Sequence, residues 1–167
     1  MLRWFTASFV AVAVAALAGA SGAAAQQVTR GNVDFTGTFD APAGTLCDFN
    51  YHQDFRFVDH FTVFGDPENA DRAIDHITEY VTHTNVDTGA TLTEVDRFNE
   101  TYNGGAQTVK DAGVFWHLRT PDGKLVVTHG GQTVLDLTTG ELVKYTPNSA
   151  PDFAGVICPA LGGSPAP

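Results

Sequence analysis

The sequence predicts an all-β protein, an antiparallel up-and-down β-barrel of about eight strands, with a β-sandwich as the alternative. Apolar and polar residues alternate from Phe49 to Val63, which is the period of a half-buried strand. Turn sequences then recur at regular spacing from Gly65 onward. The chain has 167 residues, is 43% hydrophobic and contains 12 Phe, so it can fill the core of one domain.

Residues 1–25 have the features of an export signal. Arg3 provides a short, positively charged start, Val10–Leu17 is an apolar run, and Ala23–Ala25 offers the small residues that signal peptidase recognises. We therefore expect cleavage after Ala25. The apolar run is shorter than the ~20 residues that span a bilayer. We expect a secreted, extracellular protein without a membrane anchor after cleavage.

Charge and motifs exclude several classes of partner and chemistry. The chain carries 19 acidic and 9 basic residues, a net charge of −10, and no cluster of Lys and Arg, so we expect no nucleic-acid partner. It contains no phosphate-binding loop and no nucleophile-elbow sequence. His117 and His129 could approach each other across one hairpin, but the six His lack HxH or HExxH spacing. We expect no metal and no cofactor.

Cys47 and Cys158 are the only cysteines, so a single pairing exists. In the oxidising compartment that an export signal implies, we expect them to form a disulfide. A catalytic thiol is the alternative, but neither cysteine lies in a CxxC sequence.

The elements can be assigned in chain order. Residues 26–44 form a polar, Gly-rich N-terminal extension with one short strand candidate at Val33–Phe39, and the barrel domain spans 45–160. The first long strand is the alternating segment 49–63. Residues 72–86 have some helical spacing, but their Thr, Ile, Val and Tyr content and the turn that follows favour a strand.

Four turn sequences separate the remaining strands, and the second is the strongest hairpin signal. They are Asp87–Gly89, Asn103–Gly105, Pro121–Gly123 and Thr138–Gly140. If the second is a three-residue loop, Tyr102 pairs with Ala106. Residues 161–167 form a flexible tail after the last turn.

These turns and strands resemble those of a group of small secreted proteins from high-GC Gram-positive bacteria. The resemblance lies in the Thr-Gly turn between two Thr-rich strands, the sequence Gly113–Gly123 and the strand Gly131–Asp136, and it covers roughly Cys47 to Tyr145. That group has no assigned activity, so the resemblance implies no site residue. The strand order is also similar in style to the barrel of allene oxide cyclases and dirigent proteins, which concerns architecture alone.

Hairpin geometry predicts which side chains share a face. If Asp87–Gly89 is a three-residue loop, Val86 pairs with Ala90 and His76 faces Glu100. In this register one face is the more aromatic, and we expect it to be the inner one. It collects Ile74, His76, Tyr80, Leu92, Glu94, Asp96, Phe98, Glu100, Tyr102, Val114, Trp116 and Leu118.

The candidate functional residues lie on this inner face. An unpaired carboxylate in an apolar lining is costly, so Asp59, Asp96 and Glu100 are candidate acid–base groups, together with His76. The candidate ligand-binding residues are Tyr80, Phe98, Glu100, Tyr102 and Trp116. The alternative is that a bulge or a rim position places the carboxylates in solvent.

Three functions remain open at this point. The first is a secreted barrel that binds a small, at least partly apolar or aromatic molecule in its lumen. The second is an isomerase-like or cyclase-like enzyme on the same barrel, which is less favoured because the sequence identifies no reaction. The third is an extracellular protein-interaction or inhibitor domain. The oligomeric state stays open.

Overall fold

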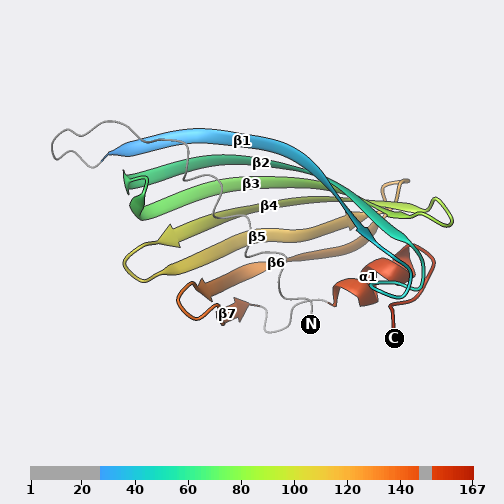
Figure 1. The fold of residues 1–167 in the computed structure, drawn as a ribbon. Coiled ribbons are helices and arrows are strands. Elements are labelled where there is room, and N and C mark those ends of the chain that lie inside the picture. Colours follow the sequence, from blue (N-terminus) through green and yellow to red (C-terminus); the bar gives the residue numbers. More distant parts are fainter. Residues whose placement is uncertain (1–26, 147–151) are drawn as a thin grey trace.

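The protein folds into one antiparallel sheet and a short C-terminal helix in a computed structural model that describes residues 27–146 and 152–167. Its elements are β1 (Val28–Ala41), β2 (Tyr51–Asp66), β3 (Asn69–Asn85), β4 (Thr91–Asn103), β5 (Thr108–Arg119), β6 (Leu125–Asp136), β7 (Leu142–Thr146) and α1 (Phe153–Ala160). Each strand pairs with the next, in the order β1 to β7 (Figure 1). The all-β, up-and-down prediction is confirmed. The predicted export signal lies outside the described residues.

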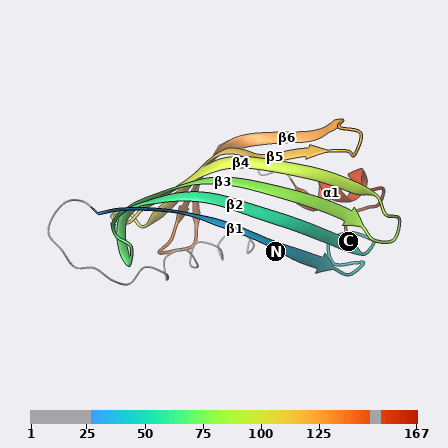
Figure 2. The same cartoon turned by 90° about the horizontal axis from the view of Figure 1, so that it is seen from above.

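The sheet is curved but is not closed. Figure 2 shows β1 and β6 at opposite margins of a bowed sheet, and β1 pairs only with β2 among the described strands. Seven strands are present, and closure into a barrel is not confirmed. The described strands also form a single sheet, whereas a sandwich needs two. Among the described residues, no helix is both long enough and apolar enough to cross a membrane.

The first strand is longer than the sequence analysis predicted. β1 covers most of the segment 26–44, which was expected to be an extension outside the domain. Its glycines explain why this edge strand was difficult to recognise. The aromatic rings of Phe61 and Phe55 lie over Gly31 and Gly37, where an added Cβ would fall 2.3 and 2.4 Å from ring carbons. An aromatic ring on the neighbouring strand thus shields each glycine.

Two sequence predictions about the following strands are confirmed. β2 alternates as expected, so that its odd-numbered residues share one face and its even-numbered residues the other. Residues 72–86 form a strand rather than a helix, as part of β3. Their β-branched side chains are restricted at χ1 and pack well on a pleated surface.

The C-terminal region differs from the prediction. Residues 153–160 form the helix α1, and residues 161–167 are held against the domain instead of forming a flexible tail. Leu161 is only 1% exposed. The backbone N–H groups of Asp48 and Ala166 donate to the carbonyls of Ser164 and Leu46, at 2.8 and 2.9 Å. An α-helical segment of eight residues carries too weak a periodic signal to be found in a Gly- and Pro-rich region.

The helix covers one end of the sheet, and we call the face it covers the inner face. The core of the protein lies there (Figure 1). Its buried members are Ala41, Leu46, Cys47, Phe49, Tyr51, Leu92, Leu118, Ile157, Cys158 and Leu161. The predicted disulfide is confirmed, with the Cα atoms of Cys47 and Cys158 5.5 Å apart and both residues fully buried. We call this region the covered end.

The hairpin between β3 and β4 has a different register from the predicted one. Its loop contains four residues, since the N–H of Asn85 donates to the carbonyl of Ala90 at 2.9 Å. The Asn85 side chain shapes the loop, because its Oδ1 accepts hydrogen bonds from the N–H groups of Asp87 and Thr88. Gly89 closes the loop with a φ of 75°.

This one-residue difference moves the even-numbered residues of β3 to the outer face. His76 lies opposite Asn99 instead of Glu100, and Glu79 lies opposite Asp96. Ile74 and Tyr80 move with His76. The inner face of β3 therefore carries its odd-numbered residues.

The hairpin between β4 and β5 also has a four-residue loop, with Gln107 at a φ of 50°. Tyr102 consequently faces Val109 and not Ala106. This register also places Val114 opposite Arg97 on the outer face, contrary to the prediction. The bulge that follows Val114 returns Trp116 and Leu118 to the inner face.

Candidate functional site

The inner face carries seven carboxyl groups between its apolar side chains. The strand registers place them on β2, β3, β4 and β5. They are Asp59, Asp75, Glu79, Glu94, Asp96, Glu100 and Asp111. Carboxylates in such a setting are expensive unless they are paired, protonated or bound to a ligand. Each of the seven therefore needs a hydrogen-bond partner, a proton or a bound ligand.

Four of these residues form a group that we call the carboxyl cluster: Asp59, Asp75, Glu100 and Asp111. Asp75 lies directly opposite Glu100, and Glu100 lies directly opposite Asp111. Asp59 is on β2, where its neighbour Phe61 faces Asp75. Burial and mutual repulsion raise the pKa of Asp75 to about 7 and that of Glu100 to about 8.

The carboxyl cluster contains a buried oxygen atom without a partner. Asp59 is only 6% exposed, and its Oδ1 is buried without a hydrogen bond. Asp111 accepts a 2.9 Å hydrogen bond from Thr133 Oγ1 through Oδ2, and the protonated carboxyl of Glu100 donates a second one. Burial raises the pKa of both Asp59 and Asp111. Buried polar atoms are nearly always hydrogen-bonded, so the Asp59 oxygen indicates a function.

The other three carboxyls lie nearer to the covered end. Glu79 is opposite Asp96, and burial raises their pKa values to about 7 and about 9. Asp96 donates a hydrogen bond to Glu94 from its protonated carboxyl, and its Oδ1 accepts one from the N–H of His117 at 3.1 Å. A protonated carboxyl between two acidic neighbours removes the repulsion that three charges would create.

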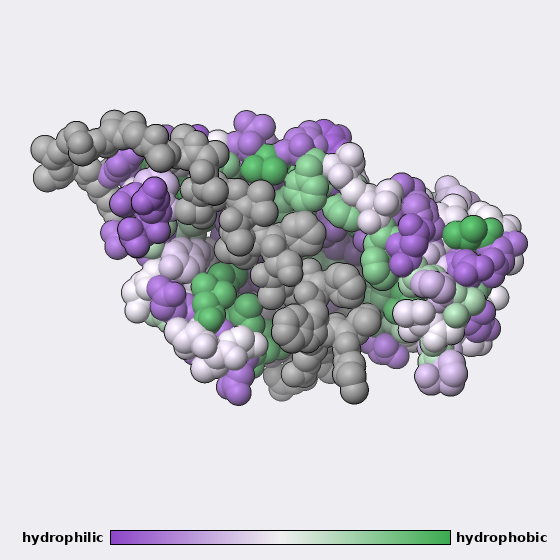
Figure 3. Space-filling model, in the orientation of Figure 1, coloured by the Kyte–Doolittle hydropathy of each residue, from purple (hydrophilic) through white to green (hydrophobic). Residues whose placement is uncertain are grey.

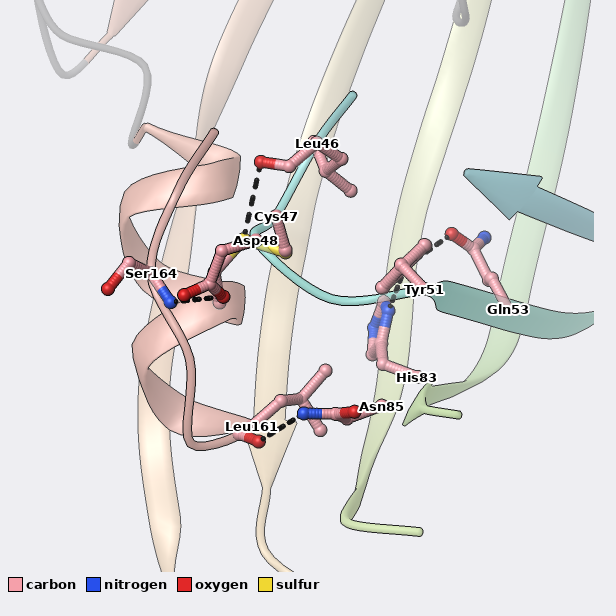
Figure 4. Close-up of a disulfide and its surroundings, with 10 residues drawn as sticks. Leu46, Cys47, Asp48, Tyr51, Gln53, His83, Asn85, Leu161 and Ser164 are labelled. Atoms are coloured by element: carbon pink, nitrogen blue, oxygen red, sulfur yellow. Dashed lines mark hydrogen bonds between the residues drawn. A yellow bond between two sulfur atoms is a disulfide. The ribbon is translucent and has the colours of Figure 1, made fainter. Parts of the chain in front are cut away.

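A chain of hydrogen bonds connects Glu94 with the covered end, and Figure 4 shows its Gln53, Tyr51 and His83 members. The Tyr51 hydroxyl donates to Gln53 Oε1 at 2.9 Å, so His83 Nδ1 donates to the tyrosine oxygen at 2.6 Å. His83 Nε2 lies 2.7 Å from Glu94 Oε2. Burial lowers the pKa of His83 to about 4 and raises that of Glu94 to about 7, which favours a neutral pair with the proton on Glu94.

Aromatic side chains complete the inner face. The rings of Phe98 and Phe115 have centroids 5.4 Å apart, and Trp116 packs against Phe153 of α1 at 5.5 Å. These aromatic residues are only half buried. The inner face thus combines accessible apolar surface with carboxyl groups.

The structure brings together most of the residues that the sequence analysis selected, but not all. Asp59, Asp96, Glu100, Phe98, Tyr102 and Trp116 lie on the inner face. His76 and Tyr80 do not. His76 Nδ1 lies 2.6 Å from Asn99 Oδ1 on the outer face, and Tyr80 is 42% exposed beside Arg56. Both were misplaced by the register of the β3–β4 hairpin.

The sequence analysis missed His83 and three of the carboxyls on the inner face. The same register error explains Asp75 and Glu79, which it assigned to the outer face. Asp111 was not placed on the inner face, because the loop between β4 and β5 is longer than expected. The one available signal along β3 was a weak alternation, in which Ile77 and Val81 lie between His76, Thr78 and Thr82.

The structure gives no support for a metal site in the part of the chain that it describes. His117 lies on the outer face, 3.3 Å from Thr128 Oγ1, whereas His129 stacks on Tyr145. No group of three or more His, Cys, Asp or Glu side chains comes close enough together there to hold a metal ion.

Two hollows among the described residues lie on the outer face. The larger has a volume of 760 Å³ and is lined mainly by Thr, Asp54, Arg56 and Tyr80. Arg56 already forms a two-pronged ion pair with Asp34, through Nε at 2.9 Å and Nη2 at 2.6 Å. This hollow thus offers a ligand fewer unsatisfied groups than the inner face.

No family model matches this chain, and searches of curated proteins and of solved structures likewise find no match. The function must therefore be argued from the site alone.

Proposed function

We propose that this protein is a secreted binding protein that holds a small, at least partly apolar or aromatic molecule against the inner face of its sheet. The observation that carries the proposal is the set of half-buried aromatic side chains beside buried carboxyls on that face. Apolar surface with a few polar groups is the usual composition of a ligand site. Phe98, Tyr102 and Trp116 would contact the apolar part of the ligand.

Secretion is supported by two features. The signal-like segment 1–25 precedes the described residues, and the buried disulfide suits an oxidising compartment. The intact mass of the exported protein should correspond to a chain that begins at Gln26 and contains one disulfide. Free thiols at Cys47 and Cys158 in the native protein would contradict this.

The binding proposal can be tested by fluorescence, because removal of residues 1–25 leaves Trp116 as the single Trp. We expect aromatic or aliphatic compounds from a panel of aromatics, lipids and sugars to shift its emission and to raise the melting temperature. The variant Phe98→Ala should weaken binding at least tenfold. The matched control Tyr80→Ala removes an aromatic ring from the outer face and should leave binding unchanged.

The proposal is wrong if no compound changes either signal, or if both variants bind equally well. The interaction-domain alternative would then be preferred, and a surface for it is present. Leu137, Leu142 and Val143 are 39%, 49% and 64% exposed near the β6–β7 edge, where Figure 3 shows a hydrophobic patch.

An acid–base enzyme on the same face is a second candidate, since carboxyls with raised pKa values suit proton transfer near neutral pH. Asp96 and Glu100 would be the reacting groups, with Asp59 beside Glu100. In this case Glu100→Gln should abolish turnover of a bound compound without abolishing its binding.

A further inference from the structure

We infer that the carboxyl cluster binds the basic nitrogen of the ligand, so that the protein selects protonated amines that carry an apolar group. This inference rests on the proposed function and specifies its ligand class. Three features of the inner face support it. They are the positions of the carboxyls of Asp59, Asp75, Glu100 and Asp111, the distribution of charge over the sheet, and the side chains that surround the cluster.

The cluster has an unsatisfied acceptor that points to a ligand. Asp59 is more than nine-tenths buried, and its Oδ1 has no hydrogen-bond partner. The strand register places Asp59 on the same face as Asp75 of the adjacent strand, and the two carboxyls interact electrostatically. Asp111 lies on β5, three strands away, and already accepts from Thr133 and from Glu100. An N–H donor bound beside Asp59 and Asp75 would satisfy the free oxygen.

No Lys or Arg side chain of the described residues lies on the inner face beside the cluster. His60 and His76, on the outer face, are the basic groups that interact with it, and they partly offset the raised pKa values of Asp59 and Asp75. The strand registers place the seven Lys and Arg residues of the strands on the outer face, and the eighth lies in a turn. They are Arg30, Arg56, Arg72, Arg97, Lys110, Arg119, Lys144 and, in the turn, Lys124. Acidic and basic groups are thus separated by the sheet. The positive charge that the cluster lacks must come from protons or from a bound cation.

The surroundings favour an amine over a metal ion. Phe61 lies opposite Asp75, and Ile77 lies between Asp59 and Phe98 across the sheet. A metal ion needs several ligands that converge on one point, and no such group of three is found among the described residues. An ammonium group beside an apolar chain fits a row of carboxyls flanked by aromatic rings, where cation–π contact adds to the attraction.

Protons and the amine compete for the same oxygens. Without a bound cation, burial and repulsion between the neighbouring carboxyls hold protons on Asp75 and Glu100 near neutral pH. A bound ammonium would stabilise the carboxylate forms, so binding should release protons. The number released can be measured by calorimetry in buffers that differ in ionisation enthalpy.

The test uses the mature, disulfide-bonded protein and two matched pairs of probes: phenethylamine with 2-phenylethanol, and octylamine with octanol. We expect each amine to bind at least tenfold more tightly than its alcohol near neutral pH, with release of protons. Asp59→Asn should remove this preference. The control Asp54→Asn, an exposed carboxyl on the outer face, should keep it.

Each outcome is informative. If amine and alcohol bind equally, the inference about charge is wrong while the proposed binding function stands. If neither binds at any concentration tested, both are wrong. Binding of Ca²⁺ or Zn²⁺ alone at one ion per chain, without binding of the amines, would replace the amine by a metal. Should Asp59→Asn fail to fold by circular dichroism, Glu100→Gln provides the same comparison.

Discussion

The covered end and the carboxyl cluster lie on the same face of the same sheet, but their side chains are satisfied in different ways. At the covered end, α1 and the residues after it bury Tyr51, Leu92 and Leu118 almost completely, and the polar groups His83 and Glu94 are hydrogen-bonded. In the carboxyl cluster, the buried Oδ1 of Asp59 has no partner. The covered end therefore provides stability, and the difference supports the proposal that the carboxyl cluster binds a ligand.

The disulfide should have the largest effect on this comparison. Cys47 and Cys158 are separated by 111 residues, and a loop of that size is worth about 4–5 kcal/mol in the chain-entropy model. We expect the Cys47→Ala, Cys158→Ala double variant to lose stability of this order in urea melts. It should also expose the covered end to hydrogen exchange. An unchanged midpoint would show that α1 is held by packing alone.

A core substitution at the covered end should have the next largest effect. Leu118 is 1% exposed, so Leu118→Ala is expected to cost about 2–5 kcal/mol through lost burial and a cavity. The control Val126→Ala removes an exposed side chain from the adjacent strand, and it should cost less than about 0.5 kcal/mol. Equal costs in denaturant melts would show that the core does not lie under α1.

Stability should fall as pH rises, because the inner-face carboxyls bind protons more tightly in the folded state. Their pKa values lie above those of the unfolded chain, at about 7 for Glu79 and about 9 for Asp96. The stability they provide is complete below about pH 4 and is lost as pH rises through about 7 to 9. A tenfold change in proton affinity is worth about 1.4 kcal/mol, and both groups lie between their unfolded and folded pKa values over most of this range, so we expect a loss of several kcal/mol between about pH 5 and pH 8.

Urea midpoints measured across this range test the prediction. Asp96→Asn should flatten the dependence, whereas Asp54→Asn, on the outer face, should not. Midpoints that rise steadily with pH would mean that the inner-face carboxyls are ionised and paired. The exposed Asp34, Asp122 and Asp136 have lowered pKa values and act in the opposite direction below this pH range. His83, whose pKa burial lowers from 6.5 to about 4, also acts in the opposite direction, at the acidic end of the range.

The smallest effect is expected on the outer face. Arg56 and Asp34 form an ion pair that is about half exposed, at 53% and 43% for the two side chains. Solvent and salt screen exposed ion pairs, so Arg56→Ala should shift the urea midpoint only slightly, and addition of salt should remove the difference. A loss comparable to that of Leu118→Ala would show that the outer face is also a structural core.

The sequence by itself determined the strands after β1, the alternation of β2 and the disulfide, because each depends on local pattern or on a single possible pairing. Hydrophobic alternation placed Asp59 on the inner face without knowledge of any neighbour. It also identified Asp96 and Glu100 as carboxyls in an aromatic setting. These predictions used residues close together in the chain.

Only the tertiary structure decided which side chains meet across strands and what covers them. The Asn85 loop has four residues rather than three, and this single residue moved His76 and Tyr80 outward and brought Asp75 inward. The helix α1 owes its place to the disulfide and to contacts with residues more than 100 positions away. Strand register depends on the length and geometry of the loops, and long-range packing depends on the folded core. The alternation of apolar and polar residues within one strand specifies neither.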